Sequence, residues 1–412
     1  MKPLAFFLFL ATFSMVCFQC EKTDTPPNPT PPINFDCADH PSVCELTSAN
    51  GHFAIDLFKT INEQELEDAN IFISPFSIST ALSMTMNGAN GETLTDMQTA
   101  LRTGTIDLAQ INEAYQTLLE VLPQLDPATQ LKIANSIWHQ NDYPVLPAFL
   151  ATNADYYASE VRSVDFRDEN IVGEVNAWIE NNTEGLITNA LSELPPNVVM
   201  LLINAIYFKG SWQTEFEPEN TVVTDFTSPT GVVEVDMMHL AESSFRYTIN
   251  DLFQAIDLPY GDSIFSMSIF LPREGHNLNE VITELSPANW EDWQAQMVPN
   301  DVELFLPKFK LEYEIKLKNT LSSMGMENAF SDRADFSQLI SGGGVKIDDV
   351  IHKAFVEVNE EGTEAAAVTV VVIVETSVPQ IPVFRADRPF VFVIHDNKTK
   401  SILFMGKVVD PS

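Results

Sequence analysis

The chain has few positive charges and a large excess of negative ones. Its 412 residues include 22 lysines and arginines against 58 aspartates and glutamates, for a formal net charge of -36 at pH 7. This charge repels nucleic-acid backbones and anionic membrane surfaces, so neither is expected as a partner. The acidic residues are spread along the chain instead of forming one block, which is typical of a solvated surface in a saline or extracellular setting.

Cysteine is also scarce, with four in the chain. Cys17 and Cys20 close an apolar run that follows Lys2 and is too short for a stable membrane-spanning helix. This run has the pattern of an export signal. Its end resembles bacterial lipoprotein signals, which implies a lipid on Cys20, while processing at Cys17 and plain cleavage of a secretory signal stay open. Export to an oxidising compartment predicts a disulfide between Cys37 and Cys44.

No apolar run after the signal is long enough for a transmembrane helix, so a membrane contact is expected only through the lipid. Residues 21–35 are rich in proline and predict an extended spacer. We therefore divide the chain into a lipoprotein-type signal peptide (1–20), a proline-rich linker that holds both remaining cysteines (21–47) and one folded domain (48–412). The expected location is the outer membrane or cell surface, with secretion or the periplasm as the alternative.

Hydrophobic periodicity predicts helices in the first part of the chain and strands in the second, which indicates an α+β fold with largely antiparallel sheets. The first helix is expected over 49–62 and the second after Pro75. Further helices are predicted at 93–102, 108–122, 147–157 and 169–181. Strands are predicted at 198–208, 221–226, 232–238, 255–259, 264–271, 302–309, 345–358, 390–394 and 402–408.

Motifs of common hydrolases and nucleotide-binding enzymes are missing. The chain has no HExxH, GxSxG or P-loop sequence, its CxxC match at Cys17 to Cys20 lies in the export signal, and its histidines are scattered, so no metal or cofactor is expected. One partial match remains: Gly261, Asp262 and Ser263 resemble the serine motif of GDS-type esterases, with Asp349 and His352 at the spacing of their later pair. The motif joins two apolar runs, which is typical of a hairpin turn, so an esterase is a distant alternative.

Motifs along most of the chain resemble those of the serpin family, and they occur in the family's order. The resemblance extends from about residue 47 to residue 411. The matching segments are NIFISPFSIS at 70–79, NAIYFKGSW at 204–212, LPKF at 306–309, HKAFVEVNEEGTEAAA at 352–367, RPFVFVI at 388–394 and FMGKV at 404–408.

The resemblance implies the serpin fold: a large central mixed β-sheet with about two further sheets, about eight or nine helices and an exposed reactive-centre loop. It also implies a protease inhibitor and not an enzyme. By the family's mechanism, a serine protease cleaves the loop, and the loop then inserts into the central sheet and traps the acyl-enzyme. The expected product is a covalent one-to-one complex between a monomeric inhibitor and the protease.

The sequence between 357 and 376 also points to a strand without a partner. Residues 368–374 read VTVVVIV, and such a run is an aggregation hazard unless it has a place in a sheet. Insertion buries alternate positions, and small side chains there favour an inhibitor over a non-inhibitory serpin with a binding or chaperone role. Gly362 permits the backbone turn at which insertion begins. The predicted hinge comprises Glu360, Gly362, Thr363, Glu364, Ala365, Ala366, Ala367, Val368 and Thr369.

Two further groups of residues are assigned by the resemblance. Ser74, Ser77, Asn204 and His352 match the family's polar cluster beneath the point where the sheet opens, where they are expected to act as a latch. At the top of the sheet, Glu360 and Lys308 match an ion pair, with Trp212 nearby. These residues are expected to control entry of the loop into the sheet.

We predict that the target protease cleaves the bond between Thr376 and Ser377. Counting forward from Gly362 by the family's spacing and counting back from Phe384 reach the same bond. Thr376 lies between Glu375 and Ser377, with valines at 374 and 378 and no basic or aromatic residue nearby. A threonine bait suits a shallow apolar pocket, as in elastase-like or subtilisin-like proteases, and not a pocket with a buried acid for lysine or arginine. Mass spectrometry of the released C-terminal peptide should show a first residue of Ser377. A peptide that begins elsewhere, for instance after Val374, would contradict the assignment.

Overall fold

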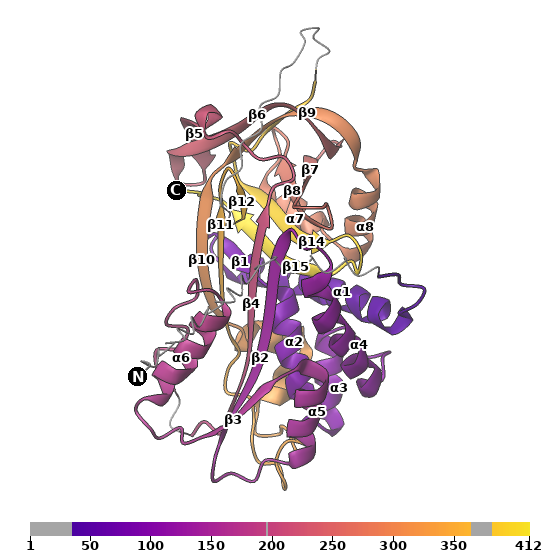
Figure 1. Cartoon of the computed structure of the whole chain (residues 1–412), viewed down its shortest axis with the longest axis vertical. Coiled ribbons are helices and arrows are strands. Elements are labelled where there is room, and N and C mark those ends of the chain that lie inside the picture. The colour runs from indigo at the N-terminus through magenta and orange to yellow at the C-terminus, as the bar shows by residue number, and fades with distance from the viewer. Residues whose placement is uncertain (1–34, 195–196, 364–380) are drawn as a thin grey trace, which may run out of the picture. The chain divides into compact units, whose positions relative to one another are not determined.

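The central sheet has six strands in the order β10-β11-β12-β4-β2-β3 (Figure 1). It belongs to the unit Pro32–Ser412 of the computed structural model, which describes residues 35–194, 197–363 and 381–412. β2 and β3 run parallel and the other neighbours antiparallel, so the sheet is mixed, as expected. Its strands are β2 (Thr129–Gln140), β3 (Glu160–Val164), β4 (Met200–Ser211), β10 (Phe309–Lys316), β11 (Ile351–Val358) and β12 (Gly362–Thr363).

The remaining described strands form one nine-stranded sheet instead of two separate smaller sheets. The reason is the length of β6, which pairs with β5, β7 and β9 and shifts register between Leu240 and Ser243. The sequence predicted only 232–238 of this strand because its later half is more polar. The strands are β1 (Ile71–Ile73), β5 (Val222–Ser228), β6 (Gly231–Ile249), β7 (Phe253–Pro259), β8 (Phe265–Pro272), β9 (Val298–Pro307), β13 (Val383–Arg385), β14 (Phe390–Asp396) and β15 (Ile402–Val408).

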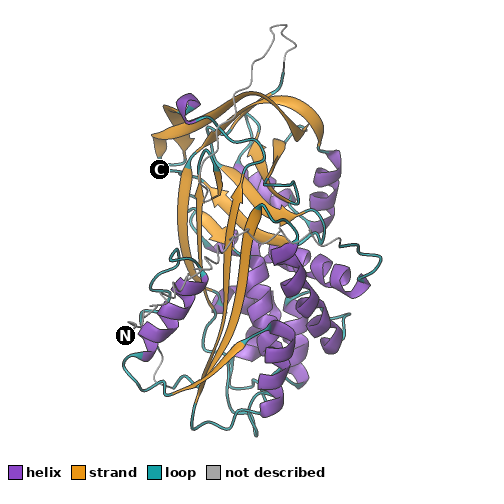
Figure 2. Cartoon of the chain, viewed as in Figure 1, coloured by secondary structure: helices purple, strands orange, loops and turns teal. Residues whose placement is uncertain are grey.

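Nine α-helices occur in the described residues, and most gather beside the lower half of the central sheet (Figure 2). Successive residues of a strand face opposite sides of a sheet, so Ala205 packs with α6 in a small cluster while Ile206 joins the main core. No helix in this part of the chain is long and apolar enough to cross a bilayer. The helices are α1 (Pro41–Gln64), α2 (Pro75–Met86), α3 (Gly91–Ala100), α4 (Leu108–Val121), α5 (Pro147–Tyr157), α6 (Ile171–Asn182), α7 (Leu278–Glu284), α8 (Pro287–Gln296) and α9 (Lys318–Leu321).

The start of α2 follows directly from its sequence. Pro75 occupies the first turn, where its missing N–H costs nothing, and the Ser74 hydroxyl accepts a hydrogen bond from the Ser77 N–H. Side-chain capping of this kind satisfies a backbone donor that the helix itself cannot. This N-cap also places Ser74 in the core, where it is fully buried.

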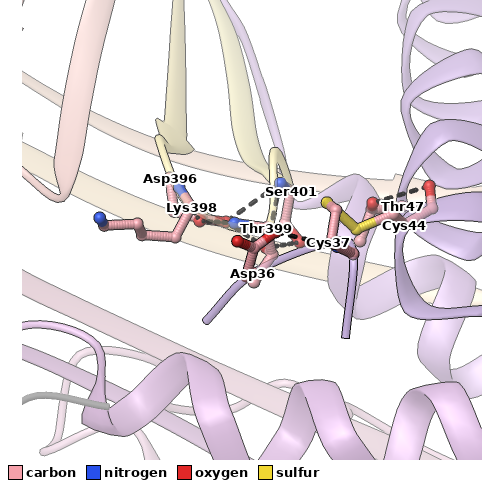
Figure 3. Close-up of a disulfide and its surroundings, with 9 residues drawn as sticks. Asp36, Cys37, Cys44, Thr47, Asp396, Lys398, Thr399 and Ser401 are labelled. Atoms are coloured by element: carbon pink, nitrogen blue, oxygen red, sulfur yellow. Dashed lines mark hydrogen bonds between the residues drawn. A yellow bond between two sulfur atoms is a disulfide. The ribbon is translucent and has the colours of Figure 1, made fainter. Parts of the chain in front are cut away.

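The first helix begins at Pro41, eight residues before the predicted start at Ala49. The segment predicted as a linker over 21–47 therefore contributes part of a helix. The disulfide between Cys37 and Cys44 lies here and joins the preceding turn to the first turns of α1. Figure 3 shows this disulfide with the turn between β14 and β15 in its surroundings. The disulfide thus ties the turn before α1 to the first turns of the helix, while packing positions the helix in the core.

β2, the only long strand in the helix-rich first part of the described chain, was not predicted from the sequence. Its sequence, TQLKIANSIWHQ, mixes lysine, asparagine and serine with apolar residues and shows no clean alternation. The strand forms because it pairs with β4 along nearly its whole length, from Thr129 to His139. A long-range partner therefore determines this element, and local sequence does not.

Candidate functional site

The most unusual feature of the central sheet is β12, a strand of two residues between β11 and β4. Thr363 pairs with Val358 on β11 and with Gly210 on β4, and Gly362 pairs with Ser211. β11 and β4 have no ladder with each other in the described chain. Among the described residues, the sheet is therefore continuous across these two strands only through β12, at its top.

Gly362 cannot be replaced by another residue without displacing the backbone. Its φ of +155° lies in the region that side-chain-bearing residues rarely adopt. A Cβ atom there would lie 2.1 Å from the Gly210 carbonyl oxygen and 2.8 Å from the Ser211 Cα. Only glycine lets the chain turn into the sheet so close to β4.

Thr363 is held in the sheet by a buried hydrogen bond. Its side chain is turned inward, with 3% of the residue exposed, and its hydroxyl lies 2.7 Å from the Tyr260 hydroxyl. Burial raises the pKa of Tyr260, so the phenol stays protonated at all ordinary pH values. Trp212 stacks on the Tyr260 ring at 4.5 Å between centroids. Thr363, the first hinge residue that points inward, therefore already has a polar partner in Tyr260, whose ring is held by stacking against Trp212.

Below Thr363, the space between the two strands is almost filled. A cavity of ≈ 20 Å³ is lined by Phe208 of β4, Val356 of β11 and Thr363, and by Leu186 and Ile187 from the segment after α6. This volume has room for about one water molecule. Entry of further strand residues therefore requires these side chains and the segment after α6 to move.

The predicted latch is only partly assembled. Ser74 donates its backbone N–H to His352 Nε2 at 3.0 Å, and its hydroxyl donates to the Leu403 carbonyl at 2.8 Å. Asn204 bonds instead to Asn135 of β2, with its amide nitrogen 2.7 Å from the Asn135 Oδ1. Ser77 contacts the group through its backbone N–H, which donates to the Ser74 hydroxyl. Asn135 was not predicted because β2 itself was missed.

His352 is neutral in the folded protein. It is 6% exposed, and burial lowers its pKa from 6.5 to about 4. Because Nε2 accepts the Ser74 N–H, the ring proton is assigned to Nδ1. Protonation of Nε2 would place a donor against this N–H, so acid opposes the contact between β11 and the start of α2.

The top of the sheet is held by three polar contacts. Lys308 Nζ lies 3.0 Å from Glu360 Oε2, and the Thr221 hydroxyl donates to Glu360 Oε1 at 2.8 Å. Partial burial alone would raise the pKa of Glu360, but hydrogen bonds from the backbone, Lys308 and Thr221 lower it overall. Trp212 donates its indole N–H to the Asn359 carbonyl at 3.0 Å. The predicted pairing of Lys308 with Glu360 is thus present, while its control of loop entry stays a prediction.

Several predicted site residues lie outside the described part of the chain. These are Glu364, Ala365, Ala366, Ala367, Val368 and Thr369 of the hinge, Thr376 and Ser377 of the bait bond, and Cys20. Their assignments stay predictions from sequence.

The residues of the esterase alternative do not form a catalytic group in their described contacts. Ser263 lies in the turn between β7 and β8, where its N–H donates to the Tyr260 carbonyl. His352 pairs with Ser74, and the Asp349 carboxylate accepts from the Lys318 N–H at the start of α9. A serine without a base is not activated, which removes the geometric basis of this alternative. The described residues also contain no cluster of side chains suited to a metal ion.

Comparison with known proteins agrees with this arrangement of strands. Residues 48–411 match the family model described as Serpin (serine protease inhibitor). The leukocyte elastase inhibitor of Xenopus laevis is 38% identical over 380 residues, covering 89% of this chain and 99% of the relative. A serpin-like protein of Thermococcus kodakarensis is 36% identical over 89% of this chain and 86% of its own length. The chain therefore belongs to the serpin family, whose members are generally protease inhibitors and not enzymes.

Solved structures show the same fold. The thermophilic serpin tengpin in its native state superposes with a TM-score of 0.81 at 34% identity, covering 93% of this chain and 97% of tengpin. Human thyroxine-binding globulin, solved in complex with its hormone, also superposes at 0.81, with 31% identity over 90% of this chain and all of that one. The fold is thus shared by serpins whose names describe different roles.

The buried histidine predicts how stability depends on pH. Because the pKa of His352 is lower in the folded than in the unfolded chain, its contribution is fully present above pH 6.5 and is lost as the pH falls towards about 4. From pH 7 to pH 5 we expect the unfolding free energy to fall by about 2 kcal/mol from this residue.

Urea unfolding followed by tryptophan fluorescence at both pH values measures the effect. His352→Gln should remove most of this pH dependence, whereas His139→Gln, at a half-buried position of β2, should not. Equal pH dependence in wild type and His352→Gln would show that His352 titrates normally.

Proposed function

We propose that the chain inhibits serine proteases as a suicide substrate. The single observation that carries this proposal is β12: the hinge residues Gly362 and Thr363 already occupy the space between β11 and β4. A loop that only displayed a bait, or that never inserted, would not need glycine at 362 or a buried site for the Thr363 hydroxyl. Below β12, β11 and β4 have no ladder with each other in the described chain, and the rest of the hinge would continue between them.

The chemistry belongs to the protease. Its serine attacks the carbonyl of the bait bond and forms an acyl-enzyme with the residue before the cut, while the amine of the next residue becomes the new amino terminus of the C-terminal segment that holds β13, β14 and β15. The free end then inserts as a strand and carries the tethered protease away before water completes hydrolysis. About 15 inserted residues span about 50 Å. Their roughly dozen ladder bonds, at about 0.5–1.5 kcal/mol each, give on the order of 10 kcal/mol to distort the protease.

The proposed targets are elastase-like or subtilisin-like proteases. The Thr376 bait among valines supports a shallow apolar pocket. A relative named leukocyte elastase inhibitor is among those similar over nearly the whole chain. The inhibitor would act as a monomer in a covalent one-to-one complex.

A binding or carrier role is the second candidate. The likeness to thyroxine-binding globulin, which was solved with its hormone bound, favours it. The small side chains expected at inward hinge positions argue against it, because a carrier that does not insert its loop does not need them. The two functions differ in whether the loop enters the sheet.

We predict that Thr363→Arg converts the inhibitor into an ordinary substrate. Thr363 is 3% exposed, and a charge buried there without a partner opposes insertion. Incubation with an elastase and a subtilisin should give an SDS-resistant complex for wild type, and mainly cleaved inhibitor with active protease for the variant.

The matched control is Thr363→Ser, which keeps the hydroxyl that faces Tyr260 and should still form the complex.

Cleavage of the wild-type loop should also raise the melting temperature, as the inserted strand buries apolar surface. Undiminished complex formation by Thr363→Arg would refute insertion at this site, and unchanged melting after cleavage would favour the carrier role.

We also propose that the protein is exported and held at the outer membrane or cell surface by a lipid on Cys20. The apolar run before Cys20 and the proline-rich segment after it support this proposal. In cells grown with a labelled fatty acid, the protein should carry the label, and Cys20→Ala should lose it. Label retained by Cys20→Ala and lost by Cys17→Ala would move the modification to Cys17, and an unlabelled wild type would indicate secretion.

A further inference from the structure

The turn between β7 and β8 (residues 260–264) is bonded to the end of β4. The Gly261 N–H donates to the Ser211 carbonyl at 2.9 Å, and Tyr260 forms an isolated β-bridge with Trp212, the residue after β4. Ser211 is also one of the two β4 residues that pair with β12. The turn and the start of the hinge are therefore held by the same short stretch of chain.

A buried carboxylate holds the other side of this turn. Asp126, shortly before β2, is 1% exposed and accepts the Asp262 N–H at 3.0 Å. A Cβ at Gly261, whose φ is +44°, would lie 2.9 Å from the Asp126 Oδ2 and 2.9 Å from the Ala128 Cβ. Glycine at 261 thus lets the turn pack against the segment before β2. The partial Gly-Asp-Ser match at 261–263 has this structural explanation.

The turn places the Tyr260 ring over a strand position that has no side chain. Gly210 of β4 pairs with Thr363, and a Cβ at Gly210 would lie 2.9 Å from the Tyr260 Cδ1. Trp212 stacks on the ring, and Phe208 contacts it edge-on at 5.0 Å between centroids. Tyr260 is fully buried, so packing fixes the direction of its hydroxyl toward the hinge.

The Tyr260 hydroxyl depends on the hinge for its hydrogen bond. Among the described residues, its partner is the Thr363 hydroxyl at 2.7 Å. If Thr363 left the sheet, the buried phenol would lose this partner, and a buried hydroxyl without a partner is costly. The contact therefore favours the hinge position seen in β12. Because the turn is bonded to β4, it favours a hinge that stays with β4 when β11 moves away.

We propose that Tyr260 is a positioning residue for loop insertion, held in place by Asp126 and the turn at 260–264. The inference rests on the proposed inhibitory function and adds the residue that keeps the hinge on β4 before the protease attacks. Insertion then continues from a paired residue, so its first ladder bond does not have to form from a free loop. Tyr260 acts through the Thr363 hydroxyl and not on the bait bond.

The test is the ratio of complexed to cleaved inhibitor after reaction with an elastase and with a subtilisin. Tyr260→Phe removes only the hydroxyl, and we expect it to lower this ratio about fivefold, the order set by one buried hydrogen bond. The rate at which the protease first attacks the loop should not change. Asp126→Ala should also lower the ratio, because it frees the turn. The matched control is Tyr247→Phe, which removes a hydroxyl that bonds to Gln254 and should leave the ratio unchanged.

A double-mutant cycle separates positioning from general stability. Thr363→Val removes the other hydroxyl of the pair and should lower the ratio by itself. If Tyr260 acts through that hydroxyl, Tyr260→Phe should lower the ratio no further in the Thr363→Val background. Melting temperatures of the uncut variants report any loss of overall stability.

Each outcome decides a different question. Equal ratios for wild type and Tyr260→Phe overturn the positioning role while the inhibitory function stands. Additive losses in the double variant, or an equal loss in Tyr247→Phe, attribute the effect to general stability and also overturn it. Faster attack on the loop at an unchanged ratio would show that the contact restrains the loop and does not start insertion. If wild type forms no complex with either protease, the proposed function itself fails and this inference with it.

Discussion

In the described chain β4 and β11 have no ladder with each other, and this gap is the constraint around which the described elements are arranged. Backbone N–H and C=O groups inside a protein need partners, so two facing strand edges in the middle of a sheet are costly to maintain. The sheet tolerates them because other contacts hold the two strands: β12 at the top, α6 and the segment after it on one face, and the main core on the other. These contacts must be strong enough to preserve the gap and weak enough to release it.

The polar contacts around the gap differ in how they can be released. The Lys308–Glu360 pair is partly exposed, so as an isolated pair it contributes little to stability. The Ser74–His352 bond is buried, and removing either partner leaves an unsatisfied donor or acceptor in the core. The lower contact is therefore the stronger restraint, and opening the sheet at its top is the easier step. β12, where Gly362 and Thr363 are already paired between β11 and β4, lies at this more easily opened top of the sheet.

Local sequence signals predicted the parts of the fold that depend on local physics. α5 begins and ends as predicted, α2 begins at Pro75 as its proline and periodicity indicate, and the turn at Gly261 joins β7 to β8 as a hairpin turn should. The features that the sequence did not predict depend on contacts between distant segments. β2 forms through β4, and the Tyr260 partner of Thr363 is 103 residues away. The family's motifs identified Thr363 and His352, but no pattern in one sequence pairs Asn204 with Asn135.

The two paired residues of β12 also affect how fast a strand can be added to the sheet. Starting a new strand between two others is slow, because the chain must lose loop entropy before any ladder bond forms. Here Gly362 and Thr363 have already lost that entropy and fixed the register, so further residues can add one after another, as in the propagation of a helix beyond its nucleus. The side-chain period of two then keeps every second residue inward without a search among registers. In the proposed mechanism, strand insertion competes with hydrolysis of the acyl-enzyme, and this preformed start shortens the slowest step of insertion.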